Sequence, residues 1–404
     1  MQANHKLKPA IAGGKPVRKK MLPLHQSDFS QAEEKAVIKV LRSGWLTKGP
    51  QTKTLEEKFT KFVKAKYAIG TNSGTSALHL ALSCLDLKKG DEIIVSPLTF
   101  VSAINSIIHC NCKPVFVDVD PLTLNIDPEQ IESKINMRTK CIMPVHLYGQ
   151  ACVMNKILRI AKKNKIFVIS DAAHALETVY NRKKIGSIGD ITCFSFHPAK
   201  NITSGEGGML VTNNKKFAQK AQMLSLHGID KSTWTRYTQD RFQHWTTIAP
   251  GFKYHMTDLQ AAIGLAQLEK IKKFWQKRKK YTKMYLSAFK DIPQIRVITK
   301  MSSLKNKNAY HLFIIQIDTK MLKINRDYIL NALLAENIGV GVHYRAIHLH
   351  SFYKNHFSFK KGMLPQAEYA AERIITLPLY PKMKQSDISD VIDAVSKVIT
   401  YYKK

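Results

Sequence analysis

The sequence predicts an α/β protein with a mainly parallel sheet in a large domain and a smaller α+β domain at the C-terminus. Short apolar runs rich in Val and Ile alternate with helix-patterned segments over residues 45–265. Continuous apolar strands separated by helices are typical of a parallel sheet covered on both faces. The pattern changes after a basic segment at 270–283. We therefore expect an N-terminal arm at 1–22, a large domain at 23–270 and a small domain at 271–404.

The bulk composition favours a cytoplasmic protein. The chain has 404 residues, of which 44% are hydrophobic. No apolar run reaches the roughly 18 residues that span a bilayer. The basic start of the chain contains no apolar segment of secretory type, so we expect no membrane insertion. The net charge of +33 favours polyanionic partners such as phosphorylated small molecules. No zinc-finger spacing and no aromatic RNA-binding signature is present, so a nucleic-acid partner is not expected.

The six cysteines are scattered. The Cys-x-Cys pair at 110 and 112 has no second pair at metal-site spacing, so no metal site is predicted. We interpret the cysteines as small buried thiols in a reducing compartment.

The elements follow in order along the chain. Residues 30–42 have apolar residues at helical spacing behind Ser30, with Glu33 placed for a capping box. The strand candidates that follow are KYAIG, DEIIVSP, KPVFVDVD, KCIMPVHLYG, KIFVIS and ITCFSF. The basic segment at 270–283 predicts a helix with a charged outer face. Beyond it, 309–318 predicts a strand, and an amphipathic helix is expected to start near residue 324.

Ligands of open parallel sheets bind at the carboxyl ends of the strands, so the residues that follow the strands are candidates for a site. Gly74 and Thr75 open a helix in SGTSALHLAL, where free N–H groups favour an anion, although many helices start with such caps. Phe100 follows DEIIVSPLT and could stack on a planar ring, although a lone aromatic residue is more often part of the core.

Two further strand ends carry titratable residues. Asp171 ends the run KIFVISD, where a buried carboxylate needs a partner. His174 would share its ligand if a helix begins there, although the pair could also be a cap. Two such residues without a third make a poor metal site. Ser195 and Lys200 follow ITCF, and Lys200 could simply be one of 63 basic residues in contact with solvent.

Together these strand ends fit one ligand. An anion site, a ring cover, a buried carboxylate and a lysine match the phosphate, ring, pyridine nitrogen and aldehyde of pyridoxal 5′-phosphate (PLP). We therefore expect PLP as cofactor.

The chain also resembles the DegT family of fold-type-I PLP enzymes, the nucleotide-sugar aminotransferases. The resemblance runs from about residue 22 nearly to the end. It rests on the motifs SGWLTKGP, SGTSALHLAL, SPLTFVSAIN, PVFVDVD, DAAHA, FSFHPAKNITSGEGG, TDLQAAIGLAQL, GVHYRAIH and TLPLYP. Within the family, the pattern is most similar to the branch that makes UDP-4-amino-4-deoxy-L-arabinose.

The resemblance assigns a role to each candidate. It implies that Lys200 forms the Schiff base with PLP and that Asp171 pairs with the pyridinium. It places His174 near the phenolic oxygen of PLP and Phe100 over the ring. The positions that contact the phosphate are Gly74, Thr75 and Ser195. Many relatives have Asn where this chain has Lys253 in GFKYH, so the roles of Lys253 and His255 stay open.

The resemblance further implies transfer of an amino group from L-glutamate, which becomes 2-oxoglutarate, to a keto nucleotide sugar. A UDP-4-keto sugar for lipid A or cell-surface polysaccharide is expected, and other 3-keto or 4-keto sugars are alternatives. The family is homodimeric, with sites at the subunit boundary. A sugar dehydratase would carry His at the position of Lys200. A non-catalytic regulator that keeps the fold is a further alternative.

Overall fold

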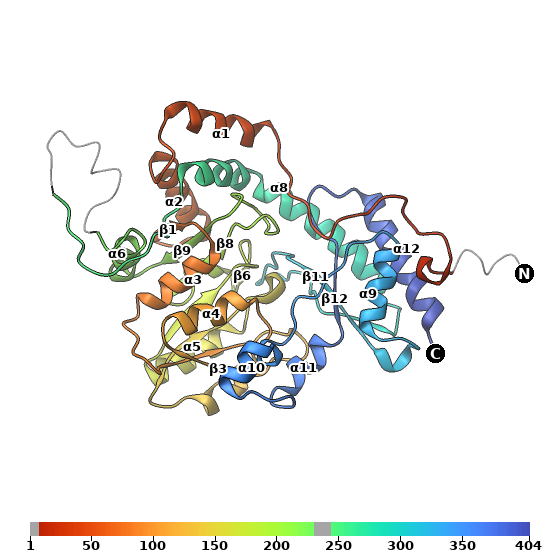
Figure 1. The fold of residues 1–404 in the computed structure, drawn as a ribbon. Coiled ribbons are helices and arrows are strands. Elements are labelled where there is room, and N and C mark those ends of the chain that lie inside the picture. Colours follow the sequence, from red (N-terminus) through yellow and green to blue (C-terminus); the bar gives the residue numbers. More distant parts are fainter. Residues whose placement is uncertain (1–7, 230–243) are drawn as a thin grey trace, which may run out of the picture.

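The computed structural model describes residues 8–229 and 244–404, and it contains one large and one small principal sheet joined by a long helix (Figure 1). The large sheet has seven strands in the order β1-β9-β8-β5-β4-β2-β3. Its strands are β1 Tyr67–Thr71, β2 Glu92–Val95, β3 Lys113–Phe116, β4 Thr139–Met143, β5 Phe167–Asp171, β8 Ile191–Ser195 and β9 Gly208–Thr212. The hairpin β6 Val179–Tyr180 and β7 Lys183–Lys184 stands apart from it.

The large sheet is parallel from β8 through β5, β4 and β2 to β3, and β9 runs antiparallel to both β1 and β8. The helices before, between and after these strands are α1 Gln31–Ser43, α2 Pro50–Val63, α3 Gly74–Ser83, α4 Val101–His109, α5 Met154–Asn164 and α6 Lys215–Leu224. Ile93 and Val95 belong to one hydrophobic cluster and Ile94 to another. The two faces of the sheet are therefore both buried, which explains the continuous apolar runs and confirms the α/β class.

The second sheet is antiparallel, in the order β10-β11-β12. Its strands are β10 Ile295–Val297, β11 Phe313–Ile317 and β12 Ile374–Leu377. The helices of this part are α8 Asp258–Phe289, α9 Arg326–Ala335, α10 Ser351–Phe357, α11 Pro365–Ala371 and α12 Gln385–Tyr402. Helix α8 contacts α1 and α2 near the large sheet and α12 near the small one (Figure 1). Helix α8 runs without a break across residue 270, where the large domain is expected to end and the small domain to begin. The domain boundaries therefore stay predictions.

Local sequence signals predicted several element ends. Ser30 accepts a hydrogen bond from Ala32, and Glu33 completes the capping box of α1. The helix expected near residue 324 begins at Arg326, with Asn325 as its cap. The strand expected over 309–318 is shorter, because regular pairing starts only at Phe313.

The basic segment at 270–283 lies in α8, and one of its charges is buried. Arg278 is fully buried, and its Nη1 donates hydrogen bonds to the carbonyls of Tyr310 and Leu379. The expectation that this helix carries its charges on an outer face is therefore wrong for Arg278. Its guanidinium reaches carbonyls of two segments that are distant in sequence.

The N-terminal arm packs against α9 and α12. The backbone N–H groups of Ala10 and Val17 donate to the carboxylate of Glu336, and Lys397 of α12 forms an ion pair with that carboxylate. Among the described residues, no helix combines the length and the apolar character needed to cross a bilayer. The cysteines are free thiols, and all except Cys110 are buried.

Candidate active site

Lys200 lies in the loop that connects β8 to β9. The loop is closed at its base, where the N–H of Phe196 donates to the carbonyl of Gly207 at 2.8 Å, and Lys200 N–H donates to the carbonyl of His197 at 2.9 Å. Lys200 is partly buried, and within residues 8–229 and 244–404 its amine has no hydrogen bond or ion pair. Burial lowers the pKa of the amine to about 8, and the nearby Asp171 opposes that shift.

Asp171 ends the neighbouring strand and faces the same edge of the sheet. It pairs in register with Cys193 of β8, two residues before Ser195. Its carboxylate is buried and accepts a hydrogen bond from the N–H of Ala173 at 2.9 Å. Burial raises the pKa of this carboxyl, and the bond from Ala173 and the charge of Lys200 lower it. The site thus sets a buried acid beside a partly buried amine.

His174 comes from a turn, so the helix that would align it with Asp171 does not form. Its Nδ1 accepts from the N–H of Tyr148 at 3.4 Å, and its Nε2 lies 3.1 Å from the hydroxyl of Tyr344. The ring of His311 packs edge-on against it at 4.6 Å between centroids. Burial, followed by the charge of Lys200, holds the pKa of His174 well below its usual range, so the ring is neutral near pH 7.

The N-terminus of α3 abuts the end of β8. A Cβ added to Gly74 would lie 2.7 Å from the Cβ of Ser195. The Ser73 side chain accepts from Ser76 N–H, so the cap leaves the N–H groups of Gly74 and Thr75 at positions without an intrahelical acceptor. Such a helix end suits a phosphate or another anion.

Phe100 lies at the start of α4 and is 55% exposed, so it is not a core residue. Its ring is 6.0 Å from the ring of Tyr344, which also stacks on His174 at 6.0 Å. Tyr344 therefore links two of the predicted site residues. Tyr344 and His311 are not among the site residues that the sequence predicts, although Tyr344 lies in the motif GVHYRAIH.

The segment that carries Tyr344 is held on both sides. Tyr148 donates its hydroxyl to the carbonyl of His343, and His343 Nδ1 lies 2.9 Å from the hydroxyl of Thr376 in β12. Ile347 N–H donates to the carbonyl of Pro97 at 2.9 Å. These bonds tie the segment to both sheets.

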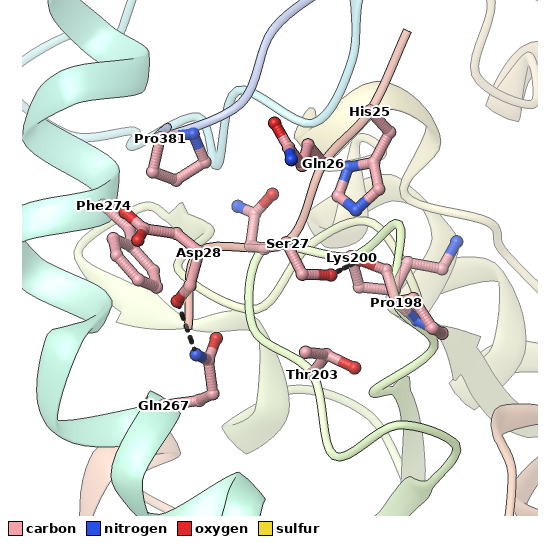
Figure 2. Close-up of a pocket in the computed structure, with 11 residues that line it drawn as sticks. His25, Gln26, Ser27, Asp28, Pro198, Lys200, Thr203, Gln267, Phe274 and Pro381 are labelled. Carbon is pink, nitrogen blue, oxygen red and sulfur yellow. Dashed lines mark hydrogen bonds between the residues drawn. The ribbon is translucent and has the colours of Figure 1, made fainter. Parts of the chain in front are cut away.

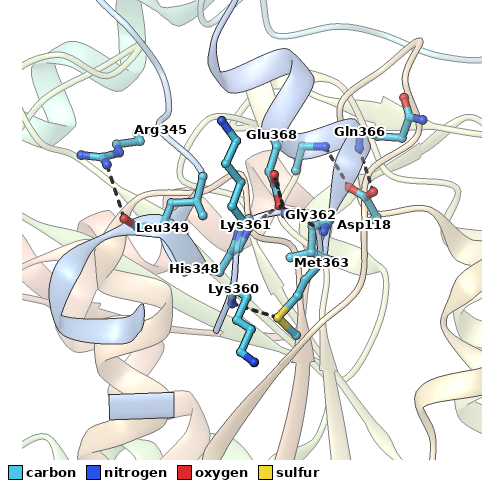
Figure 3. A network of polar contacts seen from close by, with 12 residues as sticks. Asp118, Arg345, His348, Leu349, Lys360, Lys361, Gly362, Met363, Gln366 and Glu368 are labelled. Carbon is cyan, nitrogen blue, oxygen red and sulfur yellow. Dashed lines mark hydrogen bonds and ion pairs between the residues drawn. The ribbon is translucent and has the colours of Figure 1, made fainter. Parts of the chain in front are cut away.

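A buried polar network fixes the same segment further along (Figure 3). His348 is fully buried, and its Nε2 lies 2.9 Å from Oε1 of Glu368 in α11. Glu368 also accepts from the N–H of Gly362 at 2.8 Å. Asp118, beyond the end of β3, accepts from the first turn of α11 through the N–H groups of Gln366 and Ala367. The network thus connects the Tyr344 segment to the large sheet.

The GFKYH segment passes close to the start of α3. Asn72 N–H donates to the carbonyl of Tyr254 at 2.7 Å, and the Asn72 side chain donates to the carbonyl of Lys253 at 3.3 Å. The Lys253 side chain is exposed. His255 is buried, with Nε2 3.2 Å from the hydroxyl of Thr47, and burial lowers its pKa to about 4.

The structure thus brings the predicted residues of four strand ends to one edge of the large sheet. They are Gly74, Thr75, Phe100, Asp171, His174, Ser195 and Lys200. Among the described residues, no cluster of His, Cys, Asp and Glu could hold a metal ion.

Comparison with known proteins identifies the family of this chain. The model of the DegT/DnrJ/EryC1/StrS aminotransferase family matches residues 27–396. The spore coat polysaccharide biosynthesis protein SpsC of Bacillus subtilis is 42% identical over 383 residues, which cover 95% of this chain and 98% of SpsC.

Solved structures agree with this match. The putative sugar aminotransferase Spr1654 from Streptococcus pneumoniae, in its PMP form, has a TM-score of 0.89 at 31% identity, covering 94% of this chain and 99% of Spr1654. Its PLP form has a TM-score of 0.87. PseC of Helicobacter pylori, an aminotransferase of pseudoaminic acid biosynthesis, has a TM-score of 0.88 at 30% identity, covering 95% of this chain and all 100% of PseC. On the family model and these matches, the chain belongs to the DegT/DnrJ/EryC1/StrS aminotransferase family.

Proposed function

We propose that this aminotransferase moves the amino group of L-glutamate onto a keto group of a nucleotide sugar, with PLP as its cofactor. The observation that carries the proposal is the Lys200 amine. It has no protein partner within the described residues, its pKa is lowered to about 8, and it lies near the buried Asp171. A cofactor with an aldehyde and a protonated ring nitrogen complements both groups.

The residues of this edge fit PLP. The Gly74 and Thr75 N–H groups, with the Ser195 hydroxyl beside Gly74, would hold the phosphate. Asp171 would pair with the ring nitrogen, and that cation would lower the pKa which burial has raised. The exposed ring of Phe100 is free to cover one face of the cofactor.

When bound, PLP supplies an aldehyde that carries the amino group and a ring that accepts electrons. Lys200 then acts through its own proton. An amine with a pKa near 8 is partly unprotonated at neutral pH. It can therefore take a proton from the donor's α-carbon and would return it to C4′ of the cofactor. Asp171 keeps its charge beside the ring, and the neutral His174 holds the hydroxyl of Tyr344 in place.

The nucleotide sugar is proposed from the relatives and from charge. Spr1654 is named a putative sugar aminotransferase, PseC acts in pseudoaminic acid biosynthesis, and SpsC in spore coat polysaccharide biosynthesis. A net charge of +33 attracts a diphosphate-bearing substrate. We place the reaction in cell-surface polysaccharide or lipid A biosynthesis, with a UDP-4-keto sugar as first candidate.

The test is a substrate panel read by mass. The PLP-loaded protein is incubated with L-glutamate and with 4-keto and 3-keto sugars carried on UDP, dTDP and GDP. The proposal predicts an aminated nucleotide sugar and an equal amount of 2-oxoglutarate. A dehydrated product would favour a dehydratase, and no reaction with any sugar, from a protein that binds PLP, would contradict the proposed substrate class.

A further inference from the structure

Asn201, which directly follows Lys200, joins two separate segments through its side chain. Its Nδ2 donates to Oε2 of Glu177 at 2.7 Å and to the carbonyl of Ala309 at 2.9 Å. Asn201 is 5% exposed and Glu177 is 1% exposed. Both hydrogen bonds are therefore shielded from water, where their loss costs more than at the surface.

The two partners of Asn201 belong to the walls of the site. Glu177 ends the turn that starts after Asp171 and contains His174. Ala309 precedes His311 by two residues, and its N–H donates to the carbonyl of Gly149 at 3.1 Å, next to Tyr148. One amide group thus connects the Lys200 loop to the segments that carry the acid and the histidine cluster.

Glu177, which accepts the hydrogen bond from Asn201, has a buried carboxylate that is stabilised at a distance by the charge of Arg278. Burial raises the pKa of Glu177, and the hydrogen bond from Asn201 and the charges of Arg278 and Lys307 lower it. Arg278 is fully buried as well; burial lowers its pKa to about 10, and Glu177 opposes that shift. Glu177 and Arg278 therefore stabilise each other, while Asn201 supplies the direct contact with the loop.

The segment between the N-terminal arm and α1 holds the loop from its other side (Figure 2). The hydroxyl of Ser27 donates to the carbonyl of Pro198 at 3.0 Å, and Gln267 of α8 donates to the carbonyl of Asp28 at 2.9 Å. In Figure 2 the amine of Lys200 extends away from Ser27 and Asp28. The loop is thus restrained from two directions, and the Asn201 bonds lie beside Lys200 in the chain.

We propose that Asn201 is the positioning residue of Lys200, with Glu177 and the Ala309 carbonyl as its anchors. The inference rests on the proposed role of Lys200. A four-carbon side chain fixes the amine only if its backbone is fixed, and a displacement of about 1 Å can cost about 100-fold in rate. The hydrogen bonds of Asn201 do not reach the amine, so its effect is exerted through the backbone.

The test uses the full-length protein freed of cofactor, with PLP itself as the probe. The readout is the rate at which PLP becomes fixed to Lys200, followed by visible absorbance and confirmed by borohydride reduction and peptide mass. Asn201→Ala removes both bonds, and we expect the rate to fall about tenfold or more. The lowered rate should persist at saturating PLP, since the phosphate site is untouched.

Asn136→Ala is the matched control. Asn136 Nδ2 donates to Oε2 of the buried Glu92 at 2.8 Å, at the opposite end of the large sheet. Asn136 itself is exposed, so this variant loses an Asn-to-Glu hydrogen bond in a more solvent-accessible setting. The change does not approach Lys200, and we expect the wild-type rate. Melting temperatures of both variants show that each is folded.

The Glu177→Gln variant distinguishes a loss of Lys200 positioning from a loss of folding stability. Glutamine can still accept from Asn201, but Arg278 loses its buried counter-charge. We expect a lower melting temperature with a rate of PLP fixation close to that of the wild type. An Asn201→Ala rate equal to that of Asn136→Ala would overturn the inference, as would a Glu177→Gln rate as low as that of Asn201→Ala in folded protein. A wild-type protein that never fixes PLP on Lys200 would instead contradict the proposed function.

Discussion

At the scale of single residues, the proposed chemistry depends on one amine in a chain of 63 basic residues. Lys200 differs from a surface lysine because burial lowers its pKa to about 8 and because Asp171 lies near it. Replacing Lys200 by Ala removes the nucleophile and the proton carrier. We expect turnover to fall by about 10²–10⁴-fold or more, with the melting temperature within a few degrees of wild type. Steady-state kinetics at saturating L-glutamate measure the change, and a variant with normal turnover would contradict the assignment.

The lowered pKa also predicts a pH dependence. The fraction of unprotonated Lys200 rises as the pH passes about 8, well below the ordinary lysine pKa of 10.5. The histidines whose pKa the Lys200 charge helps to lower are His25, His174, His311 and His343. They are neutral near pH 7, so they leave the midpoint at about 8. The rate of PLP fixation by cofactor-free protein, measured from pH 6 to 10, should show this midpoint, and a midpoint above 10 would contradict it.

The lowered pKa of Lys200 also predicts the direction in which the free energy of unfolding changes with pH. Between pH 8 and 10.5 the unfolded chain keeps a proton on Lys200 that the folded protein has lost. The contribution of Lys200 to the free energy of unfolding of cofactor-free protein therefore rises with pH across this window. Lys200→Ala should remove that contribution, and comparing denaturant midpoints of the two proteins at pH 7.5 and 9.5 checks the sign.

Asp171 supplies the fourth residue-scale prediction. Asp171→Asn keeps the shape of the side chain but removes the charge that would pair with the ring nitrogen. A hydrogen bond to a charged group contributes about 1.5–3 kcal/mol, so we expect the affinity for PLP to fall by about 10- to 100-fold and turnover to fall as well. Titration of cofactor-free protein with PLP measures the affinity, and unchanged binding would remove Asp171 from this role.

At the scale of elements, the sequence predicted the ends of strands better than the contacts between distant segments. Asp171 and Lys200 follow apolar runs, so their shared edge follows from the strand pattern alone. Tyr344 and His311 reach the same place from segments more than 100 residues away, and no periodicity reports that approach. Arg278 resembles its neighbouring lysines in sequence, and only the fold reveals the buried carbonyls that it meets.

The His348–Glu368 contact is the element-scale prediction. Glu368→Ala leaves His348 buried without its partner and breaks the bond to Gly362, so we expect the free energy of unfolding to fall by about 2 kcal/mol. Glu372→Ala is the control, because its ion pairs with Lys361 and Arg373 are half-exposed and worth about 0–1 kcal/mol. Urea denaturation measures both, and equal losses would show that the buried network adds nothing beyond a surface pair.

At the scale of the whole molecule, we propose a homodimer with shared active sites. The resemblance to the family implies that the residue at position 253 reaches the PLP phosphate of the partner subunit. Lys253 is exposed, and a lysine can meet a phosphate as a point charge. If each site takes Lys253 from the partner, Lys200→Ala and Lys253→Ala subunits each lack activity alone, but a mixed dimer restores one complete site. Mixing the two variants after mild denaturation should recover up to about a quarter of wild-type turnover. A chain that stays monomeric by light scattering, or mixtures that stay inactive, would contradict the shared site.

The central claim is that Lys200, in the loop after β8, is the residue to which PLP attaches. The most direct measurement is borohydride reduction of the purified yellow protein, digestion and mass analysis of the peptides. The account predicts a single pyridoxyl-phosphate mass increment on the peptide that contains FSFHPAKNITSGEGG, located at Lys200. An increment on another lysine, or a colourless protein that takes up no PLP, would contradict it.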